Sequence, residues 1–269
     1  MTTFGQFNAR VTRAREKRDP ELARRTEALR RLKRTLVDAD ATAVPANLDA
    51  LRRYLGVKEV RAQPLAIKGR IIADGPDVAI ELNESMSAFD RQFTFAHELA
   101  HLILERTRFE RQWHSDEPRT VREFEGIERL CDALAEQILL PVEWLEVRLQ
   151  SRPTLTEASA VASESATDLT FVVRRAIDLR IWKALLIRWE SNEGAFVPSE
   201  AIPATSRLFV QSVRPIGNQP SILAWSAERD GEVQEGELEI DINGECGIFH
   251  ASCISVDQGG VLSLLTLAR

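Results

Sequence analysis

Two histidines and a glutamate stand close together in the stretch FAHELAHLIL, residues 95–104. The chain has only four histidines among its 269 residues, and two of them, His97 and His101, lie here. Four residues make about one turn of an α-helix, so both imidazoles project from one face and can bind one metal ion. Glu98 follows the first histidine and completes the pattern H-E-x-x-H. The stretch therefore predicts a metal site on a helix.

Zinc is the ion that this pattern favours, because zinc accepts imidazole and carboxylate ligands in a tetrahedral site. A catalytic zinc site has three protein ligands and leaves the fourth position for water. Glu98 would take a proton from that water and pass it to the leaving amine. The alternative is a surface helix with incidental histidines. The apolar neighbours Phe93, Leu99 and Ile103 argue against it, because two imidazoles would then be buried without partners.

The third ligand must come from a later helix that packs against the first. The stretch ERLCD, residues 128–132, begins a helical pattern. Glu128 and Asp132 are four residues apart and therefore face one side of that helix. One of them can bind the metal while the other accepts a hydrogen bond from a histidine N–H. The spacing does not choose between the two.

Two segments resemble the ImmA/IrrE metallopeptidases: RQFTFAHELAHLIL (91–104) and ERLCDALAEQILLP (128–141). The family pattern is an R-x-x-F-T-x-A-H-E-x-x-H helix followed by E-x-x-A-N/D-x-F-A-x-x-L-L-x-P. The resemblance is strong over residues 66–141 and weak through residues 154–180. It implies a zincin-like domain of the gluzincin type with one catalytic Zn²⁺. It also implies the site residues: zinc ligands His97, His101 and Glu128, general base Glu98, and Asp132 behind the ligands.

The chain departs from the family pattern at Cys131, where the family has a small alanine, and at Leu134, where it has an aromatic residue. Cys131 is one turn from Glu128, so its sulfur can approach the zinc. A thiolate there would fill the open position and hold the enzyme inactive. The alternative is a small buried core residue, which free cysteines commonly are.

The remaining histidines are weaker candidates. His114, in RQWHSDE between the two motif helices, can help to polarise the scissile carbonyl or can be an exposed loop residue. His250 lies between Cys246 and Cys253, but that spacing is not a zinc signature and predicts core packing instead.

The elements around these motifs predict an α+β chain. Residues 20–37 and 46–55 have helical apolar spacing, and Asn47 can cap the second helix. Residues 65–73 and 78–84 predict a β-hairpin that leads into the first motif helix. A polar segment precedes a further helix at residues 125–147, in which Pro141 marks a break or a fresh start.

The C-terminal half changes character along its length. Residues 154–165 and 166–186 predict two helices with a helix-turn-helix outline. Residues 191–198 read as a linker, and short β-like runs follow, one of them at residues 221–228. The radiation-response branch of the resembled family adds a C-terminal domain similar to GAF sensors, which implies such a domain here. The expected domains are a metallopeptidase domain with N-terminal helices (1–150), a helix-turn-helix-like segment (151–190) and a GAF-like sensor domain (191–269).

Charge is distributed unevenly along the chain. The net charge is −6, but residues 1–34 carry 11 basic and four acidic side chains, which leaves −13 on the rest. A basic arm of this kind favours nucleic acid, and single-stranded DNA as an activating signal is one reading. The alternative is a solvated helix face that packs on the acidic body. The candidate contacts within the first predicted helix are Arg24, Arg25, Arg30, Arg31, Lys33 and Arg34.

The resemblance implies a narrow function: a zinc endopeptidase that cleaves a helix-turn-helix repressor at one site and so relieves repression of stress or defence genes, with DNA damage as a signal. The strand at residues 77–84 is expected to be a free edge that binds substrate as an added strand. One alternative is a binding or sensor module without turnover. Another is a DNA-binding regulator acting through residues 154–180, which carry little positive charge.

Composition bounds the compartment. The apolar runs are too short to cross a bilayer, and the N-terminus has no apolar signal region. Three cysteines make a disulfide framework improbable. The sequence therefore predicts a cytoplasmic protein without a membrane partner.

Overall fold

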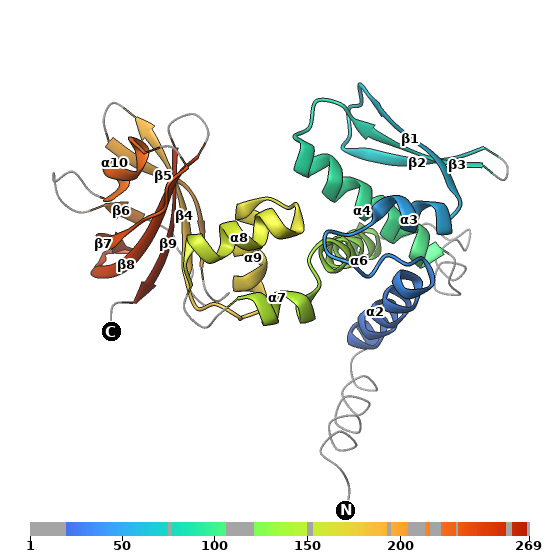
Figure 1. Cartoon of the computed structure of the whole chain (residues 1–269), viewed down its shortest axis with the longest axis horizontal. Helices are drawn as coiled ribbons and strands as arrows, with labels where there is room; N and C mark the ends of the chain where they lie inside the picture. Colours follow the sequence, from blue (N-terminus) through green and yellow to red (C-terminus); the bar gives the residue numbers. More distant parts are fainter. Residues whose placement is uncertain are drawn as a thin grey trace, which may run out of the picture. The chain divides into compact units, whose positions relative to one another are not determined.

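The structure, a computed structural model, describes residues 20–74, 77–105, 121–149, 153–192, 195–203, 213–215, 222–229, 231–256 and 260–267. The chain divides into two compact units, residues 1–140 and 141–269 (Figure 1). Each unit has its own sheet and helices. The finer division into domains 1–150, 151–190 and 191–269 stays a prediction.

The described part of the first unit begins with two helices, and both were predicted. They are α2 (Pro20–Asp38) and α3 (Leu48–Tyr54). Asn47 caps α3, because its side chain accepts a hydrogen bond from the Ala50 N–H at 3.0 Å. The apolar stripe of α2 is buried only in its C-terminal half: Leu32 and Leu36 are buried, whereas Leu22 is 36% exposed.

A three-stranded sheet follows, formed by β1 (Val57–Gln63), β2 (Gly69–Asp74) and β3 (Asp77–Asn83). The antiparallel β2–β3 hairpin confirms the prediction. β1 was not predicted; it pairs in parallel with β3, which gives the order β1-β3-β2. The expectation that residues 77–84 form a free edge is therefore wrong, because β3 is the central strand and both of its edges are paired.

The two motif helices are α4 (Ala88–Glu105) and α6 (Val121–Leu139), and they pack against each other. α4 also packs on β2 and β3. The contact surfaces are apolar, with Leu99, Ala100, Leu134 and Ile138 almost fully buried. Helix packing of this kind fixes the faces that carry the motif side chains.

The second unit begins with α7 (Val142–Arg148), α8 (Leu155–Ser165) and α9 (Leu169–Asp178). Pro141 is the N-cap of α7, so it marks a fresh helix start. The helix predicted to reach residue 186 ends at Asp178. The chain turns through Arg180, which has a positive φ of 62°, and buries Trp182.

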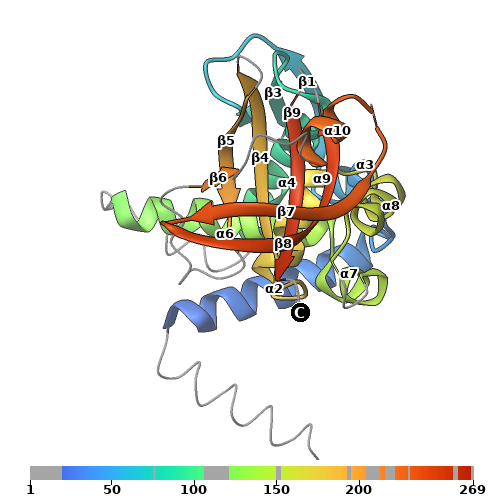
Figure 2. The same ribbon diagram turned by 90° about the vertical axis from the view of Figure 1, so that its left-hand side faces the viewer.

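A six-stranded antiparallel sheet completes the second unit, in the order β5-β4-β9-β8-β7-β6. Its end strands β5 and β6 approach each other, so the sheet curves into a near-barrel (Figure 2). The strands are β4 (Leu185–Asn192), β5 (Ala195–Ile202), β6 (Val213–Pro215), β7 (Gln234–Ile242), β8 (Glu245–Val256) and β9 (Gly260–Leu267).

Two further predictions in this unit are wrong. A linker was expected at residues 191–198, but residues 191–192 and 195–198 lie in the paired strands β4 and β5. The strand expected at residues 221–228 is a helix, α10 (Ile222–Ala227), which packs on β7, β8 and β9. Gly236 permits this packing, since a Cβ there would lie 2.8 Å from Ile222 Cδ1. The likeness of this domain to a GAF sensor stays a prediction.

None of the helices in the described part of the chain is both long and apolar enough to cross a bilayer.

Candidate metal centre

Side chains and backbone at the start of α4 fix its position. Asp90 N–H donates to Ser87 Oγ at 3.0 Å, which caps the first turn. Arg91 Nη1 donates to the carbonyl of Met86 at 2.7 Å and to that of Glu84 at 3.0 Å. These hydrogen bonds hold the β3–α4 connection against the first turn of α4. They therefore fix the direction in which the side chains of the following turns project.

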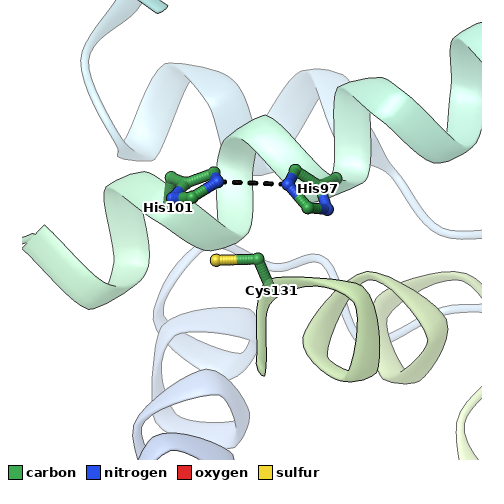
Figure 3. Close-up of side chains that lie close together, drawn as sticks. All are labelled: His97, His101 and Cys131. Atoms are coloured by element: carbon green, nitrogen blue, oxygen red, sulfur yellow. Dashed lines mark hydrogen bonds between the residues drawn. The ribbon is translucent and has the colours of Figure 1, made fainter. Parts of the chain in front are cut away.

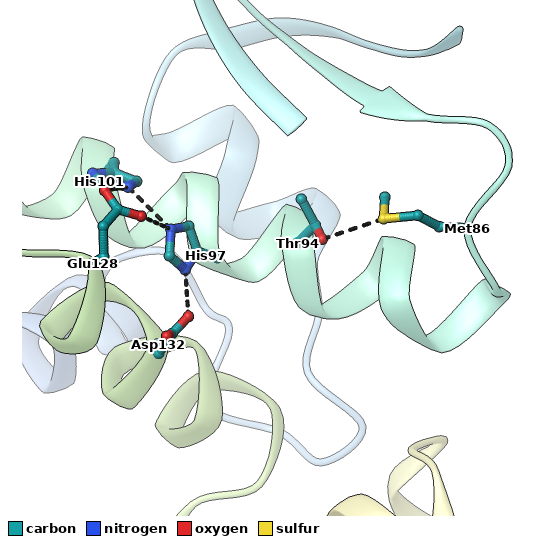
Figure 4. A network of polar contacts seen from close by, with 6 residues as sticks. All are labelled: Met86, Thr94, His97, His101, Glu128 and Asp132. Carbon is teal, nitrogen blue, oxygen red and sulfur yellow. Dashed lines mark hydrogen bonds and ion pairs between the residues drawn. The ribbon is translucent and has the colours of Figure 1, made fainter. Parts of the chain in front are cut away.

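His97 and His101 present their Nε2 atoms to each other across one turn of α4, 3.1 Å apart (Figure 4). Glu128, on α6, reaches both: its Oε2 is 3.2 Å from His97 Nε2 and its Oε1 is 3.5 Å from His101 Nε2. In a tetrahedral zinc site with bonds of roughly 2.0–2.2 Å, neighbouring ligand atoms lie about 3.3–3.6 Å apart. The three donor groups therefore have the chemistry and the spacing that one zinc ion requires.

Asp132 lies on the other side of the His97 ring. Its Oδ1 is 2.8 Å from His97 Nδ1 (Figure 4). A carboxylate only accepts, so Nδ1 carries the hydrogen and Nε2 keeps a lone pair directed at the other donors. The structure therefore distinguishes the two acids, which the spacing could not. Glu128 faces both Nε2 atoms, and Asp132 orients the His97 imidazole.

The pKa values of the two histidines are shifted in opposite directions. The pKa of His101 is lowered to about 4, chiefly by burial and also by the positive charge of His97, against a smaller opposing effect of Asp132. Burial also lowers the pKa of His97, but the hydrogen bond and charge of Asp132, with Glu128 and Glu98, outweigh it and leave that pKa raised. At neutral pH His101 therefore offers a free nitrogen lone pair.

Glu98 is buried beside this group, with only 8% of its surface exposed. Burial raises the pKa of Glu98, the charge of His97 lowers it, and Glu128 raises it again. β2 begins against it: a Cβ on Gly69 would lie 3.1 Å from Glu98 Oε1 and 2.7 Å from Thr94 Cγ2. A side chain at this point of the strand would require Thr94 or the strand to shift. A desolvated carboxylate with a raised pKa is suited to exchanging a proton with a reacting group.

Cys131 completes the cluster (Figure 3). Its sulfur and one nitrogen each of His97 and His101 all lie within 4.8 Å of one another. The residue has no exposed surface. Burial raises the pKa of the Cys131 thiol, and the charges of Glu128, Asp132 and Glu98 raise it further. Binding of this sulfur to a metal stays a prediction.

The other candidates within the described residues do not join this cluster. His114 lies outside the described residues. Cys253 is buried in the core of the second unit, as predicted, but Cys246 is exposed, and His250 Nε2 pairs with Glu235 Oε2 at 3.1 Å. Sequence reasoning missed Gly69, whose importance arises only from the packing of β2 on α4.

The arginines of α2, which were named for nucleic acid, differ in their surroundings from the arginines of α9. On α2, Arg24, Arg25 and Arg34 are exposed, while Arg31 Nε pairs with Glu27 Oε1 at 2.7 Å. The basic residues before Pro20 lie outside the described chain. On α9, Arg174 pairs with Glu200 at 2.7 Å and Arg175 is only 7% exposed, which supports a packing role for the helix-turn-helix-like pair.

Comparisons with known proteins give a fold likeness and a family domain. No curated protein matches the chain. A solved structure of a Mycobacterium tuberculosis transcriptional regulator is similar in fold, with a TM-score of 0.51 and 15% sequence identity over 89% of this chain and 75% of that one. The family model of the IrrE N-terminal-like domain, Peptidase_M78, matches residues 67–165, which include both motif helices. Residues 67–165 of this chain are therefore an IrrE N-terminal-like domain of peptidase family M78.

Proposed function

We propose that the chain is a zinc-dependent endopeptidase in which His97, His101 and Glu128 bind the metal. The observation that carries the proposal is the convergence of three donor groups, at 3.1, 3.2 and 3.5 Å, inside a domain of a peptidase family. When bound, the metal supplies Lewis acidity that polarises water and the scissile carbonyl.

The side chains of this domain would do the rest of the chemistry. Glu98 accepts a proton from the attacking water on its carboxylate and then donates it to the leaving amine nitrogen. Its burial supports that role, because a raised pKa brings the acid and base forms closer in free energy at neutral pH. Asp132 holds the His97 ring in the required tautomer. His114 remains a candidate donor to the carbonyl oxygen.

β2 is the strand that we expect to bind the substrate. It is an outer strand of the first sheet, and its first residue, Gly69, adjoins Glu98. An extended peptide can add to such an edge through backbone hydrogen bonds. The expected contact therefore moves from residues 77–84 to residues 69–74.

The substrate that we propose is a helix-turn-helix transcriptional repressor, whose cleavage relieves repression of stress or defence genes after DNA damage. This substrate class is what the resemblance to the ImmA/IrrE metallopeptidases implies, and the chain contains an IrrE N-terminal-like domain over residues 67–165. The fold likeness to a transcriptional regulator is compatible with a role in regulation.

Glu98→Gln tests the proposed function. The variant should bind one zinc per chain and lose cleavage by about 10²–10⁴-fold, because it lacks the proton acceptor. Cleavage is measured on a helix-turn-helix protein encoded beside the gene, or by labelling new N-termini in a proteome. The matched control is Glu84→Gln, an exposed acid just after β3, which should behave like wild type. Zinc binding without cleavage by wild type would instead indicate a binding module.

A further inference from the structure

We propose that the Cys131 thiolate is a fourth protein ligand of the metal and closes the centre in a latent form of the protein. This inference rests on the proposed function, since it concerns the same ion. It goes beyond that function because it describes how the site is kept inactive.

The position of Cys131 on α6 carries the inference. Glu128, Cys131 and Asp132 lie within about one turn, so one face of α6 directs all three side chains towards α4. Glu128 reaches both imidazoles at 3.2 and 3.5 Å. The Cys131 sulfur lies in the same cluster, no more than 4.8 Å from the imidazole nitrogens (Figure 3).

The distance left for the sulfur to move is small. With Zn–N near 2.0–2.1 Å and Zn–S near 2.3 Å, nitrogen and sulfur ligands of one tetrahedral ion are about 3.6 Å apart. A shift of the sulfur by about 1 Å therefore suffices, which is within the reach of a side-chain torsion without moving α6. Two imidazoles, a carboxylate and a thiolate are all common zinc ligands.

Binding of the sulfur would leave no position on the metal for water. Four protein ligands fill a tetrahedral site and are typical of structural zinc, whereas catalysis needs one position for water. When the sulfur binds, the S–H proton leaves to solvent and the water at that position is displaced. Glu98 then has no activated water to deprotonate. Cys131 leaving the metal restores the open site, so this residue would control whether the peptidase is active.

X-ray absorption at the zinc edge of the zinc-loaded full chain tests the inference. Wild type should show one sulfur at about 2.3 Å together with nitrogen and oxygen ligands. Cys131→Ser should lose the sulfur and keep the other ligands. Cys253→Ser is the matched control, because Cys253 is equally buried but lies in the second unit. It should keep the sulfur signal. Cleavage by Cys131→Ser should be faster than by wild type.

The outcomes separate this inference from the proposed function. Zinc bound stoichiometrically in wild type with only nitrogen and oxygen scattering overturns the role of Cys131 and leaves the peptidase proposal intact. A sulfur signal that persists in Cys131→Ser, or in Cys131→Ala should the serine variant not fold, also overturns it. Failure of wild type to bind zinc overturns both.

Discussion

The two ring nitrogens of His97 have different partners. Nδ1 is 2.8 Å from the Asp132 carboxylate, and Nε2 faces His101 and Glu128. The Asp132 carboxylate holds the His97 ring in place and makes Nε2 a better electron-pair donor to a metal ion. The same charge favours the protonated ring when no metal is present. Below the raised pKa of His97, a metal ion must therefore displace a proton from this ring, whereas His101 stays unprotonated until its own pKa of about 4 is approached.

This difference predicts how zinc affinity depends on pH. The pKa of His97 is raised above 6.5, so below that raised pKa each unit of acid should weaken zinc binding about tenfold, as one proton competes with the metal. His101 should add a second proton only near its pKa of about 4, where the dependence becomes steeper. Competition titrations with a chelator at several pH values measure both regions.

Asp132→Asn provides the control for the pH profile. The amide removes the charge that raises the pKa of His97, so the onset of the decline should move to lower pH. Zinc affinity at neutral pH should also fall about 10–100-fold, as expected for the loss of a carboxylate behind a histidine ligand. An unchanged onset in this variant would show that Asp132 does not set the protonation of His97.

Residue types and spacing were enough to predict that His97 and His101 share a face of one helix. Spacing could not assign Glu128 and Asp132, because both lie on the same face of α6. Which of the two reaches the Nε2 atoms depends on the depth and angle at which α6 packs against α4, and these are properties of tertiary packing.

At the scale of elements, the contact between β2 and α4 constrains the position of Glu98, because Gly69 of β2 adjoins that side chain. Gly69→Ala should destabilise the protein by about 1–3 kcal/mol, because the new methyl group would lie 2.7 Å from Thr94 Cγ2. It should also slow cleavage, since the same methyl group would lie 3.1 Å from Glu98 Oε1. Urea unfolding and the cleavage assay measure the two effects.

Gly126→Ala is the matched control for this substitution. Gly126 lies in α6, and a Cβ there meets no atom within 4 Å. Alanine in place of a helical glycine should stabilise the protein by about 0.4–1 kcal/mol. Equal stability of Gly69→Ala and wild type would show that β2 can move away from α4, and that Gly69 does not constrain Glu98.

Secondary elements were predictable where burial is one-sided and periodic. α2, α3 and the β2–β3 hairpin agree with their apolar spacing. β1, VKEVRAQ, escaped prediction because it is an outer strand with mostly exposed or half-buried side chains, so its sequence lacks an alternating apolar pattern. Residues 179–186 resembled a helix because six of the eight are apolar. The end of α9 is set instead by a left-handed turn at Arg180 and by the burial of Trp182.

At the scale of the whole chain, charge and chemistry are separated along the sequence. Residues 1–34 carry a net charge of +7, while the remainder carries −13 and includes the whole metal centre. The part of this basic segment that the structure describes is α2, whose Arg24, Arg25 and Arg34 are exposed. Helical geometry therefore presents cations to solvent while Leu32 and Leu36 anchor the helix in the core. This arrangement suits an arm that receives a polyanionic signal.

Single-stranded DNA binding tests that role of the arm. Labelled oligonucleotide should bind the full chain with an affinity that falls as salt rises, with a logarithmic slope of about −0.7 for each phosphate that is neutralised. The triple variant Arg24→Ala, Arg25→Ala, Arg34→Ala should reduce that slope by about 2 if all three contact phosphates. Substitution of Lys68, an exposed lysine in the loop before β2, by alanine should change the slope little.

Absence of binding at low salt, or equal slopes for the triple variant and wild type, would show that the signal does not enter through α2. The metal centre would remain unaffected by that result, because the substituted side chains are exposed and none of them is among the groups that converge on the metal position.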